Sequence, residues 1–166
     1  MNSAPTALLL AERLGKALQA GRQTLVTAES CTGGGIAWLI TSIPGSSQWF
    51  ERGIVAYSNA AKQELLEVSH DVLVKFGAVS EQTAIAMARG ALQNSHANIS
   101  VAVTGIAGPD GGTESKPVGT VCFAWAQDNG YIQSAHVFFS GDRQQVREQA
   151  ILMAVQGVLD MIEATD

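Results

Sequence analysis

Residues 24–35 have the sequence TLVTAESCTGGG, and this stretch decides the fold that the rest of the chain completes. Its first five residues are apolar or β-branched, which favours a short strand buried on both faces. A hydroxyl, a thiol and three consecutive glycines follow, and residues 36–43 then form an apolar segment that Pro44 and Gly45 end. This order predicts a strand, a glycine loop and a helix, as in an α/β domain.

The flanking sequence predicts further elements of both kinds. Helical spacing of apolar residues predicts helices over residues 5–20, 60–68, 71–76, 81–93 and from 142 onward. Strand composition is found over residues 53–57, 99–103, 120–126 and 131–139. Asp128, Asn129 and Gly130 join the last two strands in a pattern typical of a hairpin. We therefore predict a three-layer α/β/α fold with a mixed sheet of about five strands.

Composition excludes several classes of protein. A chain of 166 residues with 46% hydrophobic residues is long enough for one domain with one sizeable core, so residues 1–166 are expected to form a single domain. The net charge of −5 argues against nucleic acid and anionic membranes as partners. No apolar run approaches the length of a membrane span. Two distant cysteines and a start without a basic segment predict a cytoplasmic protein with reduced thiols.

The loop after the first strand offers a nucleophile. Ser30 lies at a strand-to-helix turn, where unpaired N–H groups and the positive end of the helix dipole can stabilise an oxyanion. A structural interpretation stays open, in which Ser30 or Thr32 only caps the helix and the glycines permit close packing. Cys31 is an alternative nucleophile or a small packing residue.

A serine nucleophile needs a base, and a lysine is better placed than any histidine. The three histidines lie in boundary segments or on a hairpin strand, where structural or surface roles are expected: His70, His96 and His136. Lys62 lies in the first turn of a helix that Ser58 or Asn59 caps, and the helix dipole there lowers the pKa of a lysine. Tyr57 precedes this helix and could orient the amine or relay a proton. A solvated Lys62 and a half-buried Tyr57 remain possible.

Two further segments indicate an anionic ligand. The glycine-rich loop that starts at Thr104 lies beside Ser30 if its strand is parallel to the first, because ligands of open α/β sheets bind at the carboxyl ends of the strands. Arg143 begins the last helix, where an anion would compensate its charge, although an exposed arginine is the plain alternative. No cluster of metal-binding residues has ligand spacing, so no metal site is expected.

Seven motifs occur in order along the chain: TAESCTGG at 27–34, WFERG at 49–53, YSN with Lys62 at 57–62, GAVS at 77–80, TGIAGPDGG at 104–112, KPVGTV at 116–121 and SGDR at 140–143. Together they resemble the CinA C-terminal domain family, most of all its stand-alone nicotinamide mononucleotide deamidases. The resemblance covers nearly the whole chain. It implies one antiparallel strand in a five-stranded sheet, and hydrolysis of nicotinamide mononucleotide (NMN) to nicotinate mononucleotide and ammonia, without a cofactor, in pyridine nucleotide recycling.

The resemblance also implies site residues. Ser30 is then the nucleophile and Lys62 the base, with Tyr57 nearby. Thr104, Gly105 and Gly108 fall where the family binds its nucleotide, and Arg143 is expected to assist with the phosphate. Backbone N–H groups of Thr32, Gly33 and Gly34 are expected to hold the oxyanion. A homodimer is expected for a small enzyme of this type. Two other functions stay open, a nucleotide-binding regulatory module without turnover and an interaction protein of DNA uptake or damage response.

Overall fold

The computed structural model of the chain describes residues 3–164. Its elements, in chain order, are α1 (Ser3–Ala20), β1 (Leu25–Glu29), α2 (Gly35–Thr41), the 3-10 helix η1 (Ser46–Gln48), β2 (Phe50–Val55), α3 (Asn59–Leu66), α4 (His70–Phe76), α5 (Glu81–Gln93), β3 (Ile99–Gly105), β4 (Thr120–Gln127), β5 (Ile132–Phe138) and α6 (Arg143–Glu163). Within this part of the chain, no helix is both long and apolar enough to span a membrane.

All five strands belong to one sheet in the order β2-β1-β3-β4-β5. Strand β1 is parallel to β2 and β3, whereas β4 is antiparallel to β3 and to β5. The sheet therefore has one strand, β4, that runs against the other four. The predicted mixed five-stranded sheet and its one antiparallel strand are confirmed.

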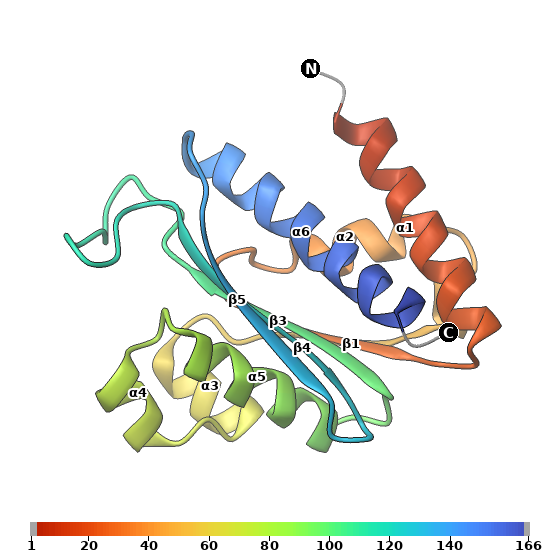
Figure 1. The fold of residues 1–166 in the computed structure, drawn as a ribbon, viewed down its shortest axis with the longest axis horizontal. Coiled ribbons are helices and arrows are strands. Elements are labelled where there is room, and N and C mark those ends of the chain that lie inside the picture. Colours follow the sequence, from red (N-terminus) through yellow and green to blue (C-terminus); the bar gives the residue numbers. More distant parts are fainter. Residues whose placement is uncertain (1–2, 165–166) are drawn as a thin grey trace.

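Helices cover both faces of the sheet, which gives the three layers seen in Figure 1. Helices α1, α2 and α6 lie on one face, and α3, α4 and α5 lie on the other. The side chains of β1 alternate between the two apolar cores, because Leu25 packs with α1, α2 and α6 while Val26 and Ala28 pack with α3 and α5. Burial on both faces explains why this strand is apolar or β-branched over most of its length.

Strand β2 differs from the prediction of residues 53–57, because it begins at Phe50 and ends at Val55. It is an edge strand that pairs only with β1. Glu51 and Arg52 form an ion pair on it, with Nε 2.7 Å from the carboxylate. Charged residues of this kind occur on edge strands. Because the prediction relied on strand composition, it placed the start of β2 too late.

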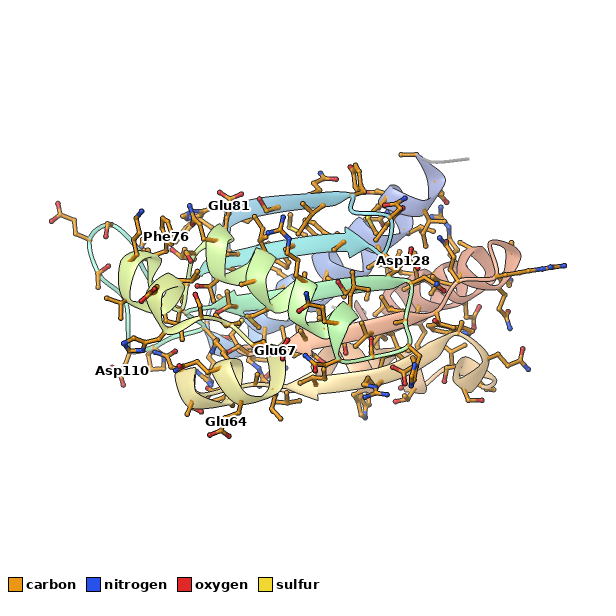
Figure 2. All side chains as sticks on the ribbon, turned by 90° about the horizontal axis from the view of Figure 1, so that it is seen from below. Glu64, Glu67, Phe76, Glu81, Asp110 and Asp128 are labelled. Atoms are coloured by element: carbon orange, nitrogen blue, oxygen red, sulfur yellow. The ribbon has the colours of Figure 1, made fainter. Side chains whose placement is uncertain are left out.

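The adjacent parallel strands β1, β2 and β3 all end on the same side of the sheet. After β1 the chain returns through α2 to β2, and it then crosses through α3, α4 and α5 to β3 on the other side of β1. The carboxyl ends of β1 and β3 therefore flank a topological switch point, where open α/β sheets bind ligands. Figure 2 shows Asp110, in the loop after β3, at this end with Phe76, and Asp128 of the β4–β5 turn at the other end.

Candidate active site

Ser30 is the first residue after β1 and continues the hydrogen bonding between β1 and β3. Its amide donates to the carbonyl of Val103 in β3 over 2.9 Å. The chain then turns sharply into α2 through Gly33 and Gly34, whose φ values are 59° and 94°. Residues with a side chain adopt these left-handed values at a cost, which explains the paired glycines. The serine hydroxyl is thereby held at the carboxyl end of the central strands.

Capping of α2 does not involve the hydroxyl of Ser30 or Thr32, so the structural interpretation of these two residues as caps is wrong. Gly34 is the N-cap residue and makes no side-chain cap. The carboxylate of Glu29, which is completely buried, takes that role by accepting from the amides of Ile36 at 2.9 Å and Ala37 at 3.1 Å. It also accepts from the Thr32 hydroxyl at 2.7 Å. Sequence analysis missed Glu29, because an acidic residue that ends a buried strand carries no distinct local signal.

Lys62 reaches Ser30 from α3. Ser58, rather than Asn59, caps this helix by accepting from the Ala61 amide at 3.0 Å, so Lys62 is its fourth residue. Helical side chains point back toward the helix N-terminus, and the Lys62 amine accordingly returns to the start of α3. Its Nζ lies 3.0 Å from Ser30 Oγ and 3.1 Å from the carbonyl oxygen of Tyr57. The predicted pairing of hydroxyl and amine is therefore present in the structure.

The surroundings of Lys62 favour its neutral form. The side chain is 2% exposed, and burial lowers its pKa below the ordinary value. Within residues 3–164 the ion pairs are Arg13 with Glu163 and Arg52 with Glu51, so no described carboxylate pairs with this amine. Burial therefore shifts the pKa of Lys62 in the predicted direction. A neutral amine beside a hydroxyl is able to accept a proton from it.

Tyr57 contacts the Lys62 amine through its main chain and not through its side chain. Its backbone carbonyl binds the Lys62 amine and lies 3.4 Å from Ser30 Oγ. Its side chain is exposed, and the phenol oxygen accepts from Arg143 Nη2 at 3.2 Å. Of the two roles predicted for Tyr57, orientation of the amine is therefore provided by its main chain, whereas the phenol that would relay a proton is bonded to Arg143 instead.

A pocket of about 270 Å³ opens over the Ser30 hydroxyl. Six of its lining residues were predicted as substrate-binding or catalytic partners of Ser30, namely Tyr57, Lys62, Thr104, Gly105, Gly108 and Arg143. The Arg143 guanidinium donates to the Gly108 carbonyl at 2.7 Å, which ties α6 to the loop after β3. Larger hollows of about 550 and 700 Å³ lie along α6, but neither is lined by a lysine, histidine or cysteine.

The last residue of β3, Gly105, packs closely against Cys31, the residue after Ser30. A Cβ added to Gly105 would lie 2.9 Å from the Thr120 carbonyl oxygen and 3.1 Å from Cys31 Sγ, so a side chain would not fit there. The Thr104 hydroxyl is engaged with the Ala78 carbonyl at 2.8 Å, which anchors the turn before α5 to β3. The motifs TGIAGPDGG and GAVS are thus joined in one wall of the pocket.

Comparison with known proteins agrees with the motifs. The family model of the CinA C-terminal domain matches residues 8–162. The chain belongs to the CinA C-terminal domain family. It is 52% identical over 147 residues to nicotinamide-nucleotide amidohydrolase PncC of Escherichia coli strain K12, covering 89% of each chain. It is 50% identical over 152 residues to PncC of Pseudomonas putida, covering 92% of this chain and 94% of that protein.

Solved structures agree with this family assignment. The crystal structure of competence/damage inducible protein CihA from Agrobacterium tumefaciens has 42% sequence identity and a TM-score of 0.91, and the match covers 95% of each chain. The resemblance inferred from the seven motifs is confirmed. The CinA C-terminal domain of this chain therefore has both the family's sequence and its fold.

Three predicted substrate-binding residues of this CinA C-terminal domain do not line the pocket: Thr32, Gly33 and Gly34. The Gly33 amide donates to the Ser30 carbonyl at 3.0 Å, so its N–H is already engaged. The Thr32 amide donates to no other described residue. A role for these residues in holding an oxyanion stays a prediction, and the geometry favours the amide of Thr32 over that of Gly33.

The other candidate nucleophile and bases fall outside the chemistry of the site. Burial raises the pKa of the Cys31 thiol to about 12, so it is protonated at neutral pH and a poor nucleophile. The three histidines are exposed, and none of them lines the pocket: His70, His96 and His136. The preference for a lysine base over a histidine base agrees with this placement.

Proposed function

We propose that this chain hydrolyses the carboxamide of NMN to give nicotinate mononucleotide and ammonia. Two observations support the proposal. Relatives about half identical to this chain over most of its length are named nicotinamide-nucleotide amidohydrolases. The pocket brings a serine hydroxyl, a buried lysine and an arginine into one hollow. The first two are the parts that acyl transfer needs, and the third suits a phosphate.

The observation that carries the mechanism is the 3.0 Å distance between Lys62 Nζ and Ser30 Oγ. In the proposed acylation, neutral Lys62 takes the hydroxyl proton while Ser30 Oγ forms a bond to the carboxamide carbon. The carbonyl oxygen becomes an oxyanion. When the tetrahedral intermediate collapses, the C–N bond breaks and the proton held by Lys62 passes to the leaving nitrogen, which departs as ammonia.

Deacylation uses the same groups in reverse. Lys62 takes a proton from water as its oxygen attacks the nicotinoyl ester on Ser30. The ester C–O bond then breaks, and the proton returns from Lys62 to Ser30 Oγ. The product is nicotinate mononucleotide, and the free enzyme is regenerated with both groups in their starting states. No step requires a cofactor.

The test is incubation of the purified protein with NMN while ammonia and the acid product are both measured. We expect both products in equal amounts with the wild type. We expect none above background with Ser30→Ala, which removes the nucleophile but little binding surface. Cys31→Ala is the matched neighbour and should keep substantial activity. Nucleotide binding without ammonia release would favour a non-catalytic regulatory module, and near wild-type turnover in Ser30→Ala would overturn the mechanism.

The proposal also covers recognition of the ribose phosphate, the cellular role of the reaction and the oligomeric state of the enzyme. Arg143 and the segment from Thr104 to Gly108 would hold the ribose phosphate. The reaction would belong to pyridine nucleotide recycling in the cytoplasm, carried out by a homodimer of single-domain chains. Sedimentation of the purified protein tests the dimer, and the acid product tests the placement in recycling.

A further inference from the structure

Arg147 contacts the nucleophile loop without lining the pocket. It lies one turn after Arg143 in α6 and is half-buried. Its Nε donates to the carbonyl of Cys31 and its Nη2 to the carbonyl of Thr32, both at 3.2 Å. These carbonyls belong to the two residues that follow Ser30, so one guanidinium binds both peptide units there. The mechanism described above assigns no role to this side chain.

The direction of a carbonyl fixes the direction of the next amide. A trans peptide unit is planar, with its C=O and N–H pointing to opposite sides. Arg147, by holding the Cys31 carbonyl, therefore fixes where the Thr32 N–H points. The Ser30 carbonyl is held in the same way by the Gly33 amide, which fixes the Cys31 N–H. Among the described residues, the Thr32 N–H donates to no other residue, whereas the Cys31 N–H is within hydrogen-bond reach of its own thiol.

The Cys31 and Thr32 amides are the first two after the nucleophile. On strand-to-helix turns of hydrolases, the amide after the nucleophile is a donor to the oxyanion. The loop is anchored from its other side by Glu29, which accepts from the Thr32 hydroxyl. The position of Thr32 is thus set by a carboxylate on its side chain and a guanidinium on its carbonyl. The positive charge of Arg147 also polarises the two peptide units that it binds and strengthens the N–H groups of Thr32 and Gly33 as donors.

We propose that Arg147 is a positioning residue of the oxyanion site, holding the Thr32 amide toward the oxygen that becomes negative in the reaction, while the Gly33 amide fixes that of Cys31. This inference rests on the proposed amide hydrolysis at Ser30. It differs from the role of Arg143, which lies in the pocket itself. Loss of the Arg147 contacts should therefore destabilise the transition state, whereas the affinity for the ground-state substrate should change little.

The first test compares two variants of α6. Arg147→Met removes both contacts to loop carbonyls, and Gln149→Met removes two contacts of the same kind, to the carbonyls of Ser140 and Gln145 at 2.9 Å, away from Ser30. We expect kcat for NMN to fall roughly 10- to 100-fold in Arg147→Met with KM within about threefold, somewhat less than for direct loss of an oxyanion donor. Arg147→Lys should recover part of the loss, and Gln149→Met should keep kcat within about twofold.

The second test does not depend on turnover. Pyridine-3-boronic acid is the probe: Ser30 Oγ forms a bond to boron, the hydroxyl proton passes to Lys62, and boron becomes a tetrahedral anion that resembles the intermediate. We expect the affinity for this probe to fall in Arg147→Met by the same factor as kcat. The affinity for nicotinate mononucleotide should stay unchanged, and the thermal midpoint should match that of Gln149→Met.

Several results would overturn the inference. One is boronate affinity within about twofold of wild type in Arg147→Met, and another is an equal loss of affinity for product and boronate, which marks a merely structural residue. A wild type that binds no boronate overturns it as well. If the wild type binds boronate but releases no ammonia from NMN, the proposed function fails, while the boronate comparison still decides the role of Arg147.

Discussion

Among residues 3–164, no carboxylate pairs with the buried Lys62 amine, which makes this side chain suited to act as a base and costly to the stability of the fold. Burial disfavours the charged form, so the pKa is lowered and part of the lysine is neutral at a lower pH than in the unfolded chain. Two acceptors, Ser30 Oγ and the Tyr57 carbonyl, satisfy the amine without supplying a negative charge. Burial of Lys62 therefore lowers the stability of the folded protein but supplies a neutral amine that can act as a base.

The first prediction follows from that pKa. Below the lowered pKa both folded and unfolded chains are protonated there, and the folded state bears the full cost of the buried charge. Between that pKa and the ordinary value of 10.5, the unfolded chain binds more protons, so stability rises with pH. Lys62→Met should therefore raise the thermal midpoint most at low pH, with a gain that shrinks toward high pH. Its kcat should fall about 10²- to 10⁴-fold.

Thermal unfolding and turnover across a pH series check both parts. Wild-type kcat/KM should rise with pH and level off below the ordinary lysine pKa, because the neutral amine is the active form. An exposed lysine, Lys16→Met, is the control and should show neither effect. A wild-type profile that is flat with pH, or a midpoint gain independent of pH, would contradict the role given to Lys62.

Arg143 supports a second prediction at this scale. Its guanidinium is held by the Gly108 carbonyl and the Tyr57 phenol, so it is already placed at the pocket rim. If it meets the phosphate, Arg143→Ala should mainly raise KM for NMN, with a loss of roughly 1.5 to 3 kcal/mol. Nicotinamide riboside, which lacks the phosphate, should be a poor substrate that the variant scarcely worsens.

Steady-state kinetics with both substrates measure this difference. Arg13→Ala, which breaks an exposed ion pair with Glu163, is the matched loss of a cation and should leave both substrates unaffected. Equal losses with NMN and the riboside in Arg143→Ala would show that the arginine is structural, and phosphate recognition would then fall to the Thr104 loop alone.

At the scale of elements, the N-terminal turn of α3 is expected to affect catalysis, because this turn positions Lys62. Ser58 and Ser69 cap α3 and α4 by the same bond, to the amides of Ala61 at 3.0 Å and Val72 at 3.2 Å. Each change to alanine should cost about 1 kcal/mol of stability. Only α3 carries the base, so Ser58→Ala should also lower kcat about 5- to 20-fold, whereas Ser69→Ala should not.

Chemical denaturation and kinetics of the two cap variants separate these effects. Equal stability losses with equal kcat values would mean that the position of Lys62 does not depend on the start of α3. A loss of kcat in Ser58→Ala alone would tie catalysis to this one turn of helix.

Local signals explain why most elements were predictable. The α5 helix occupies the predicted residues 81–93 because its cap, Ser80, and its apolar face lie within the segment itself. The capping box of Asp142 and Gln145 was likewise visible in the sequence. Strand β2 was placed too late because its start depends on pairing with β1, and a charged edge strand has weak local preference.

At the scale of the whole molecule, the site combines parts that lie far apart along the chain. The Ser30 and Lys62 pair and the pocket position of Arg143 were foreseen, because their chemistry and motifs stand out in the sequence. Glu29 and Arg147 were not, since their roles depend on contacts that only the folded chain forms. Arg147 and Thr32 are 115 residues apart. What the sequence could not provide was therefore these tertiary contacts rather than the chemistry of the residues.

The two helical layers are expected to affect catalysis differently, and two glycines test this. A Cβ added to Gly90 in α5 would collide with the backbone of Leu66 at the end of α3, and one added to Gly157 in α6 would collide with the ring of Trp125. Gly90→Ala and Gly157→Ala should each destabilise the fold by roughly 1 to 3 kcal/mol, although alanine is the better helix former. Backbone cannot yield as a side chain does, so Gly90→Ala should displace α3.

Displacement of α3 moves Lys62, which lies four residues before Leu66 in the same helix. We therefore expect kcat to fall at least about tenfold in Gly90→Ala, because a shift of about 1 Å in a catalytic group is enough to slow the reaction strongly. Gly157→Ala should lose stability but keep kcat, since Trp125 and Gly157 lie outside the pocket. Both quantities are measured well below the thermal midpoint of each variant, so that unfolding does not enter kcat. Equal kcat values in the two variants would show that the position of α3 tolerates the collision, and that the lysine is held by Ser30 and the Tyr57 carbonyl alone.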